Sequence, residues 1–162
     1  MVKKYVFGDP IETDAIVKEI KETIWNDELF KKEGNVFQYS LKPDEIVYGL
    51  GENVRGINKR GWRYVSNCSD NPNHCEHTNS LYGAHNFIMM GDGVSETYGL
   101  FVDTPGTVIF DVGYTDIDRL SIAMENENYK IYLIEGETYQ DVVREFREMI
   151  GRSYIAPRWA FG

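Results

Sequence analysis

The densest group of chemically capable side chains lies in residues 67–80, which read NCSDNPNHCEHTNS. Thiolates and imidazoles are the ligands that zinc prefers, and the segment holds both, in the set Cys68, Asp70, His74, Cys75, Glu76 and His77. The spacing C-x5-H-C-x-H matches no zinc finger, ribbon or knuckle, and neighbouring side chains of an extended chain point to opposite faces. We therefore interpret the segment as a polar loop and predict no metal and no cofactor. A Cys68–Cys75 disulfide would matter only in an oxidising compartment.

Aromatic side chains flank this loop, and with nearby polar groups they form a candidate sugar-binding set: Trp62, Tyr64, Tyr82 and His85. Aromatic rings cover the apolar C–H face of a sugar, and polar groups take its hydroxyls. Alternating aromatics are equally typical of ordinary sheet packing, so both interpretations stand at this point. A single isolated histidine such as His85 is more often packed or hydrogen-bonded than catalytic.

Other catalytic patterns are weak. The segment GLGEN at residues 49–53 and the basic turn after it do not fit a phosphate-binding P-loop, and tight turns at a strand end explain them better. The nucleophile motif G-x-S-x-G is absent from the sequence. Paired carboxylates hydrolyse glycosides, and acids are plentiful, but spacing alone singles out no pair.

Most of the chain has the texture of a β protein. Short segments with alternating or continuous apolar residues are separated by the turn sequences GDG, DTPG, GYTD and NEN. The predicted strands are Asn35–Leu41, Ile46–Leu50, Trp62–Ser66, Asn86–Met90, Thr97–Val102, Thr107–Val112, Arg119–Met124 and Tyr129–Ile134. Seven or eight strands at this spacing predict a mainly β fold, an antiparallel β-sandwich.

Two helices are expected outside the strands. Thr138 with Asp141 three residues later predicts a helix over 138–150, and its apolar stripe is Tyr139, Val142, Val143, Phe146 and Ile150. Gly151 would stop it. The spacing of Ile16, Ile20 and Ile24 also predicts a short helix over 13–25. We assign residues 1–34 as an N-terminal extension, because their texture differs from the rest.

Composition excludes several classes of protein. The chain has 162 residues, 42% of them apolar, and a net charge of −9, which disfavours nucleic-acid binding. No apolar run is long enough to span a membrane, and the first residues lack the apolar core of a signal peptide. With only two cysteines as well, we expect a soluble, cytoplasmic protein.

Several blocks, in order, resemble glycoside hydrolase family 31. They are LKPDEIVYGLGENVRGINKRGWRY (41–64), LYGAHNFI (81–88), YGLFVD (98–103), YLIEGETYQDVVREFREMIGR (132–152) and PRWAFG (157–162). The resemblance covers residues 36–162. It implies a galactose-mutarotase-like β-sandwich over 35–152, with 153–162 as the start of a (β/α)8 catalytic barrel. Family members are mostly retaining α-glucosidases, whose two catalytic acids lie on that barrel, so none is expected within this chain.

The resemblance also suggests substrate-binding residues. In the family, one sandwich loop reaches over the active-site mouth, and an Asp in an N-x-D pattern contacts the sugar. The matching stretch here is 64–70, YVSNCSD, which has two residues between Asn67 and Asp70 where the family has one. The implied substrate-binding set is Asp70, Trp62, Tyr64 and His85. The implied partners are an α-glucoside oligosaccharide and the protein's own barrel, with no nucleic acid and no membrane.

Two other classes remain open. One is a stand-alone carbohydrate-binding β-sandwich that uses Trp62 and Tyr64. The other is a mutarotase-like enzyme, which needs a His acid and a Glu base, although only three histidines are available. The apolar segment SYIAPRWAFG at residues 153–162 is expected to be either a C-terminal strand of the sheet or the start of a further domain. The likeness of PRWAFG to the start of a barrel argues against the stand-alone binding module.

Overall fold

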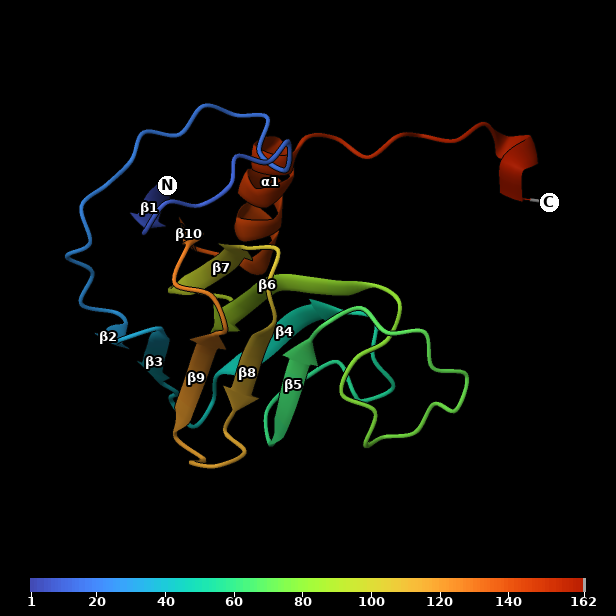
Figure 1. Ribbon diagram of the computed structural model, residues 1–162, viewed down its shortest axis with the longest axis horizontal. Coiled ribbons are helices and arrows are strands. Elements are labelled where there is room, and N and C mark those ends of the chain that lie inside the picture. The colour runs from blue at the N-terminus through green and yellow to red at the C-terminus, as the bar shows by residue number, and fades with distance from the viewer. Residues whose placement is uncertain (162) are drawn as a thin grey trace.

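The computed structural model describes residues 1–161, and most of its regular secondary structure is β-strand (Figure 1). The strands are β1 (Val2–Phe7), β2 (Lys31–Glu33), β3 (Val36–Ser40), β4 (Ile46–Gly51), β5 (Trp62–Ser66), β6 (Ala84–Gly91), β7 (Thr97–Asp103), β8 (Val108–Val112), β9 (Arg119–Met124) and β10 (Tyr129–Gly136). One α-helix, α1 (Tyr139–Ile150), and one 3-10 turn, η1 (Arg158–Phe161), complete it. Within residues 1–161, no helix has the length and apolar character needed to cross a membrane.

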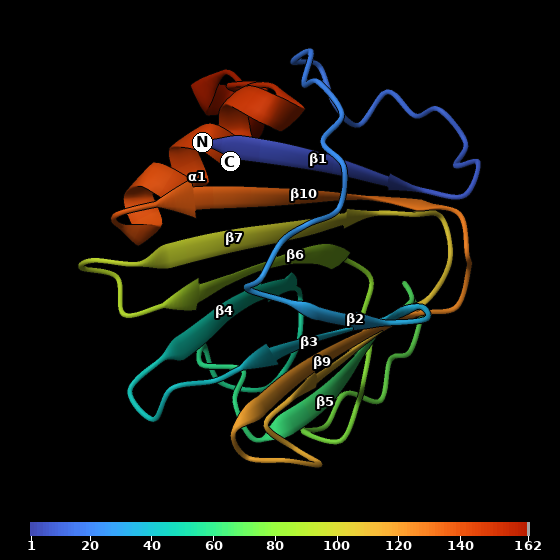
Figure 2. The same cartoon turned by 90° about the vertical axis from the view of Figure 1, so that its left-hand side faces the viewer.

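The strands form two five-stranded antiparallel sheets. The first has the order β1-β10-β7-β6-β4 and the second the order β2-β3-β9-β8-β5. Figure 2 shows the two sheets as stacked layers, with α1 on the outer side of the first sheet. The predicted mainly β fold with an antiparallel sandwich is confirmed, and each of the eight predicted strands overlaps an observed one.

Strand β10 is buried on both faces. Its side chains at Tyr129, Ile131 and Leu133 belong to the core between the sheets, whereas Tyr132 and Ile134 belong to a second apolar cluster under α1. Alternate residues of a strand point to opposite faces, so residues 131–134 form a continuous apolar run rather than an alternating pattern.

The helix predicted over 138–150 is α1, and its capping box is present. The Thr138 side chain accepts from the Asp141 backbone N–H, and the Asp141 carboxylate accepts from the Thr138 backbone N–H. The buried face differs from the predicted stripe, because Val142 and Met149 are fully buried whereas Val143 is 37% exposed. The predicted stripe therefore lies partly on the open side of α1, the side that faces away from the first sheet.

The helix predicted over 13–25 is wrong, since this segment contains no helix. Ile16 and Ile20 do pack on the apolar cluster under α1, but from an irregular chain. The backbone N–H groups of Val17 and Lys18 donate to the Met149 carbonyl at 2.9 and 3.3 Å. The last carbonyls of a helix have no partner within it, so this segment satisfies one of them instead of forming its own helix.

The sandwich begins well before residue 35. Strand β1 pairs with β10 from Val2 to Phe7, and β2 pairs with β3 across the turn at Gly34. Trp25 lies between these strands, with its ring centroid 4.7 Å from Tyr5 and 5.0 Å from Phe37. Parts of residues 1–34 are therefore edge strands and core of the sandwich, not an appendage to it.

The segment after α1 leaves the sandwich. Residues 152–161 join neither sheet, so the interpretation of this segment as a sheet strand is wrong. Its large apolar side chains are exposed, namely Tyr154, Ile155, Trp159 and Phe161. Figure 1 shows this tail projecting to the same side of the molecule as the long β5–β6 loop.

Two glycines let α1 approach the first sheet closely. A Cβ at Gly99 of β7 would lie 2.5 Å from Val142 Cγ1, and one at Gly136 would lie 3.0 Å from Val142 Cγ2. Val142 is fully buried in the hollow that these glycines leave. The hollow sets how deeply the helix sits.

Gly99→Ala is expected to lower the free energy of unfolding by about 1–3 kcal/mol, because the added methyl group displaces Val142. Gly56→Ala is the matched control, since a Cβ there meets nothing within 4 Å. It should leave stability unchanged or raise it by up to about 1 kcal/mol. Urea unfolding followed by circular dichroism measures both, and equal midpoints for the two variants would contradict this packing.

Candidate functional site

The candidate site is built on the β5–β6 loop, residues 67–83. Its two limbs run side by side at the base, where the Val65 N–H donates to the Asn79 carbonyl at 3.4 Å and the Ser69 N–H donates to the Leu81 carbonyl at 3.0 Å. Leu81 is buried and fixes the returning limb to the sandwich. Beyond this base lies the loop tip, residues 70–78, which forms neither strand nor helix.

Asp70 lies at the tip with its side chain exposed. Hydrogen bonding to Asp70 raises the pKa of the Tyr82 phenol above its ordinary value. The His74 ring meets Tyr82 edge-on, with 5.9 Å between ring centroids. Asp70, His74 and Tyr82 therefore form one polar and aromatic cluster, in which an exposed carboxylate stands beside two rings.

A second cluster lies at the root of the loop, around Arg55. The guanidinium carbon of Arg55 lies 4.4 Å from the Trp62 ring centroid and 4.9 Å from that of Tyr64. His77 meets Trp62 edge-on at 6.1 Å. Beside them is a groove of about 270 Å³, whose lining residues are Arg55, Trp62, Arg63, His77, Asn79 and Tyr114.

The segment GLGE anchors the far end of the loop. Gly49, Leu50 and Gly51 all have positive φ, at 120°, 67° and 69°, where β4 is interrupted by a register shift. This turn brings Glu52 to Gly83: the Glu52 N–H donates to the Gly83 carbonyl at 2.8 Å, and the Gly83 N–H donates to Glu52 Oε2 at 3.1 Å. The structure therefore agrees with a tight turn at a strand end.

The predicted sugar-binding residues fall into two groups. Asp70 and His85 are exposed, on the tip and on β6. Trp62 is half-buried, with the Arg55 guanidinium over its ring, and Tyr64 is only 3% exposed in the core. Burial also raises the pKa of Tyr64. The Tyr64 ring therefore has no face open to a sugar, because β5 turns this residue toward the opposite sheet.

Sequence reasoning missed Arg55 as a site residue. It lies in the basic turn after GLGE, nine residues before Tyr64 and more than twenty before Asn79, and it contacts both. Neither motif nor spacing indicates such contacts. Within residues 1–161, no three His, Cys, Asp or Glu side chains converge on a common point, and both cysteines are free thiols.

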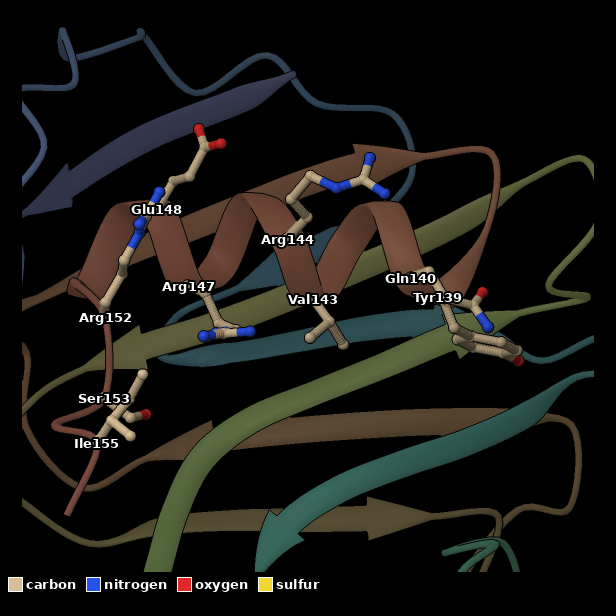
Figure 3. Close-up of a pocket in the computed structure, with 9 residues that line it drawn as sticks. All are labelled: Tyr139, Gln140, Val143, Arg144, Arg147, Glu148, Arg152, Ser153 and Ile155. Carbon is tan, nitrogen blue, oxygen red and sulfur yellow. The ribbon is translucent and has the colours of Figure 1, made fainter. Parts of the chain in front are cut away.

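A second hollow, of about 760 Å³, lies between the open side of α1 and the tail. Figure 3 shows the side chains that line it. Val143 and Arg147 of the helix line it together with Ile155. Tyr139, at its end, donates to the Gly91 carbonyl at 2.7 Å, and burial raises its pKa to about 12. Its one lining carboxylate, Glu148, has no acidic partner there, so the hollow lacks the paired acids of a glycosidase centre.

Two stacked antiparallel sheets, a covering helix and a long loop after β5 define a galactose-mutarotase-like β-sandwich. Residues 8–111 match the family model described as "Glycosyl hydrolase 31 N-terminal galactose mutarotase-like domain". The chain belongs to this family, as the resemblance of its sequence blocks had indicated.

Curated relatives agree with this assignment. The chain is similar to an α-glucosidase of Saccharolobus solfataricus, with 31% identity over 99% of this chain and 24% of the relative. It is also similar to the α-xylosidase XylQ of Lactiplantibacillus pentosus, with 30% identity over 98% of this chain and 20% of the relative. The chain therefore spans about a quarter or less of the length of these relatives.

Solved structures share the fold. A cycloalternan-degrading enzyme of Trueperella pyogenes in complex with isomaltose matches with a TM-score of 0.70 and 25% identity, over 78% of this chain and 19% of that one. A GH31 dextranase of Flavobacterium johnsoniae complexed with glucose matches with a TM-score of 0.70 and 25% identity, over 85% and 17% of the two chains.

The cluster at the loop tip can be tested by titration. Asp70→Ala is expected to lower the pKa of Tyr82 toward the ordinary value near 10, because a carboxylate that accepts a hydrogen bond from the neutral phenol disfavours ionisation of that phenol. Tyrosine ring-carbon NMR over the alkaline range measures this pKa. Asp44→Ala, at an exposed acid on another turn, is the control. A pKa of Tyr82 that is the same in Asp70→Ala as in the wild type would refute the hydrogen bond between the two residues.

Proposed function

We propose that this chain is the non-catalytic N-terminal domain of a retaining α-glucosidase, which removes terminal α-linked glucose from oligosaccharides. The observation that supports this proposal most directly is the family match, together with the small share of each relative that the chain spans. The similar proteins include an α-glucosidase, an α-xylosidase and a dextranase, which supports an α-glycoside as substrate.

In this proposal the sandwich supports a catalytic barrel and shapes the rim through which substrate enters. The β5–β6 loop and the tail project to the same side (Figure 1), and the tail carries exposed Trp159 and Phe161. Exposed clusters of large apolar side chains are typical of surfaces that contact another domain. The barrel would lie on this side, within reach of the loop tip.

Asp70 is the residue that we expect to meet the substrate. Its exposed carboxylate at the loop tip can accept a hydrogen bond from a sugar hydroxyl. Such a charge-assisted bond contributes about 1.5–3 kcal/mol when shielded from water. The retaining reaction itself needs two carboxyl groups about 5–5.5 Å apart, one as nucleophile and one as acid and base, and both would come from the barrel.

An α-xyloside is the second candidate substrate, because the α-xylosidase relative is nearly as similar as the α-glucosidase. The two sugars differ at C6, so pocket shape around that group separates them. A stand-alone carbohydrate-binding module is disfavoured by the burial of Tyr64 and the stacking of Arg55 on Trp62. The two exposed free thiols support a reducing, cytoplasmic location as part of the proposal.

The chain alone is expected not to hydrolyse α-glycosides, because the two catalytic carboxyls belong to the barrel. Release of nitrophenol from aryl α-glucoside and aryl α-xyloside should appear only in the longer protein that carries the domain. Activity that copurifies with the isolated chain through several columns would refute the assignment of catalysis to the barrel.

In the longer protein, Asp70→Asn should lower kcat/KM on a disaccharide by about ten- to hundredfold, since each 1.36 kcal/mol is tenfold. Asp44→Asn serves as the matched control and should leave kcat/KM unchanged. Activity should fall but survive, because the catalytic acids remain. If Asp70→Asn has wild-type kinetics on a disaccharide and on an aryl glucoside, Asp70 does not contact the substrate.

A further inference from the structure

Building on the rim-loop function proposed above, we propose that Arg55 is the positioning residue of the β5–β6 loop. It ties the loop tip to the sandwich and so favours one pose of the tip, in which Asp70 is presented on the rim. Arg55 itself does not touch substrate in this role. It acts through the loop.

The hydrogen bonds of Arg55 reach three separate segments. Its Nε donates to the Glu76 carbonyl at 2.6 Å, in the loop tip. Its Nη1 donates to the Arg63 carbonyl of β5 at 2.6 Å, and its Nη2 donates to Asn79 Oδ1 of the returning limb at 3.3 Å. One side chain therefore joins the tip and the returning limb to a strand of the sandwich.

The Arg55 guanidinium also lies over two aromatic rings. Trp62 and Tyr64 are two residues apart on β5, so their rings share one face of the strand and together form a platform for Arg55. Tyr64 is buried in the core between the sheets, which fixes the platform. In this way the packed sandwich restrains an exposed loop through Arg55.

The tip has little else to hold it. Within residues 1–161, the bond from Arg55 to the Glu76 carbonyl is the one hydrogen bond that joins the loop tip, residues 70–78, to a residue outside the loop. The other bonds of the tip are local, such as that from the Thr78 N–H to the Cys75 carbonyl at 2.9 Å. The edge contact between His77 and Trp62 adds to the same root cluster.

Lysine cannot replace arginine in this role. Three donors in a planar fork reach three acceptors while the flat face stacks on two rings, whereas an ammonium is a compact point charge. Arg55→Lys therefore keeps the charge and removes the geometry. It is the substitution that tests the role of Arg55.

The first measurement uses the chain itself and a protease that cleaves after glutamate. Arg55→Lys should speed cleavage after Glu76 by about tenfold or more, because the bond that restrains this carbonyl is lost. Arg60→Lys is the matched control, since the Arg60 guanidinium also donates to several carbonyls, including those of Lys42 and Ile117, away from this loop. Mass spectrometry locates the cut, and circular dichroism verifies the fold of each variant.

A second variant guards against misfolding of the first. Trp62→Leu removes half of the stacking platform and leaves Arg55 in place, so cleavage after Glu76 should again be faster. Wild-type cleavage rates in both folded variants would overturn the positioning role, whether or not the glycosidase proposal holds.

The second measurement uses the longer protein. Arg55→Lys should raise KM for a disaccharide by about tenfold and leave kcat on an aryl glucoside unchanged, because only the presentation of Asp70 is disturbed. The double variant Arg55→Lys/Asp70→Asn should have the same kcat/KM as Asp70→Asn alone, because both substitutions remove the same contact between Asp70 and the substrate. Additive losses would show that Arg55 does not act through Asp70. A wild-type protein inactive on every α-glycoside would refute the proposed function and leave the cleavage result to decide the role of Arg55.

Discussion

The burial of β10 on both faces is the constraint on which the rest of the structure depends. Residues 129–134 of this strand are at most 3% exposed. One face is covered by the second sheet. The other would expose Tyr132 and Ile134 to water without α1 and the irregular segment that carries Ile16 and Ile20. Because apolar area removed from water is the main favourable term in folding, the N-terminal segment and α1 are both drawn onto this sheet.

The same strand explains why the N-terminal segment is needed. Lys130 lies in β10 and is 3% exposed, although a buried ammonium is costly without a partner. Its Nζ bonds Glu12 Oε2 at 2.9 Å, and this bond lowers the pKa of Glu12. Glu12 belongs to the residues that sequence texture marked as an extension. The partner of a buried charge therefore comes from more than a hundred residues away.

Sequence patterns predicted what depends on local periodicity and missed what depends on distant partners. The strands follow from alternation, and α1 follows from its capping residues. The isoleucine spacing at 16–24 looked helical, but the end of α1 takes the N–H groups of Val17 and Lys18. A one-residue change of register moves every side chain to the other face, so sequence alone did not show that Tyr64 enters the core.

The sequence predicted that Asp70 lies in a polar loop after a strand, as the structure shows, and its contact with substrate stays a prediction. The contacts that hold this loop could not be predicted. Arg55 and Asn79 are distant in sequence, and their contact exists only because β5 and GLGE bring the loop limbs together. Loops carry binding residues when a rigid scaffold positions them.

Ordering an exposed loop costs about 1–2 kcal/mol of conformational entropy per residue. A nine-residue tip with few tertiary bonds is therefore only marginally stable in one conformation. A charged hydrogen bond contributes about 1.5–3 kcal/mol and each cation–π contact about 0.5–1 kcal/mol. Arg55 alone therefore offsets only a fraction of the cost of ordering the tip. The remainder must come from local turns and from whatever surface the tip meets. An arginine suits this task, because its charge does not change over the physiological pH range, whereas a histidine at the same place would release the loop as it lost its proton.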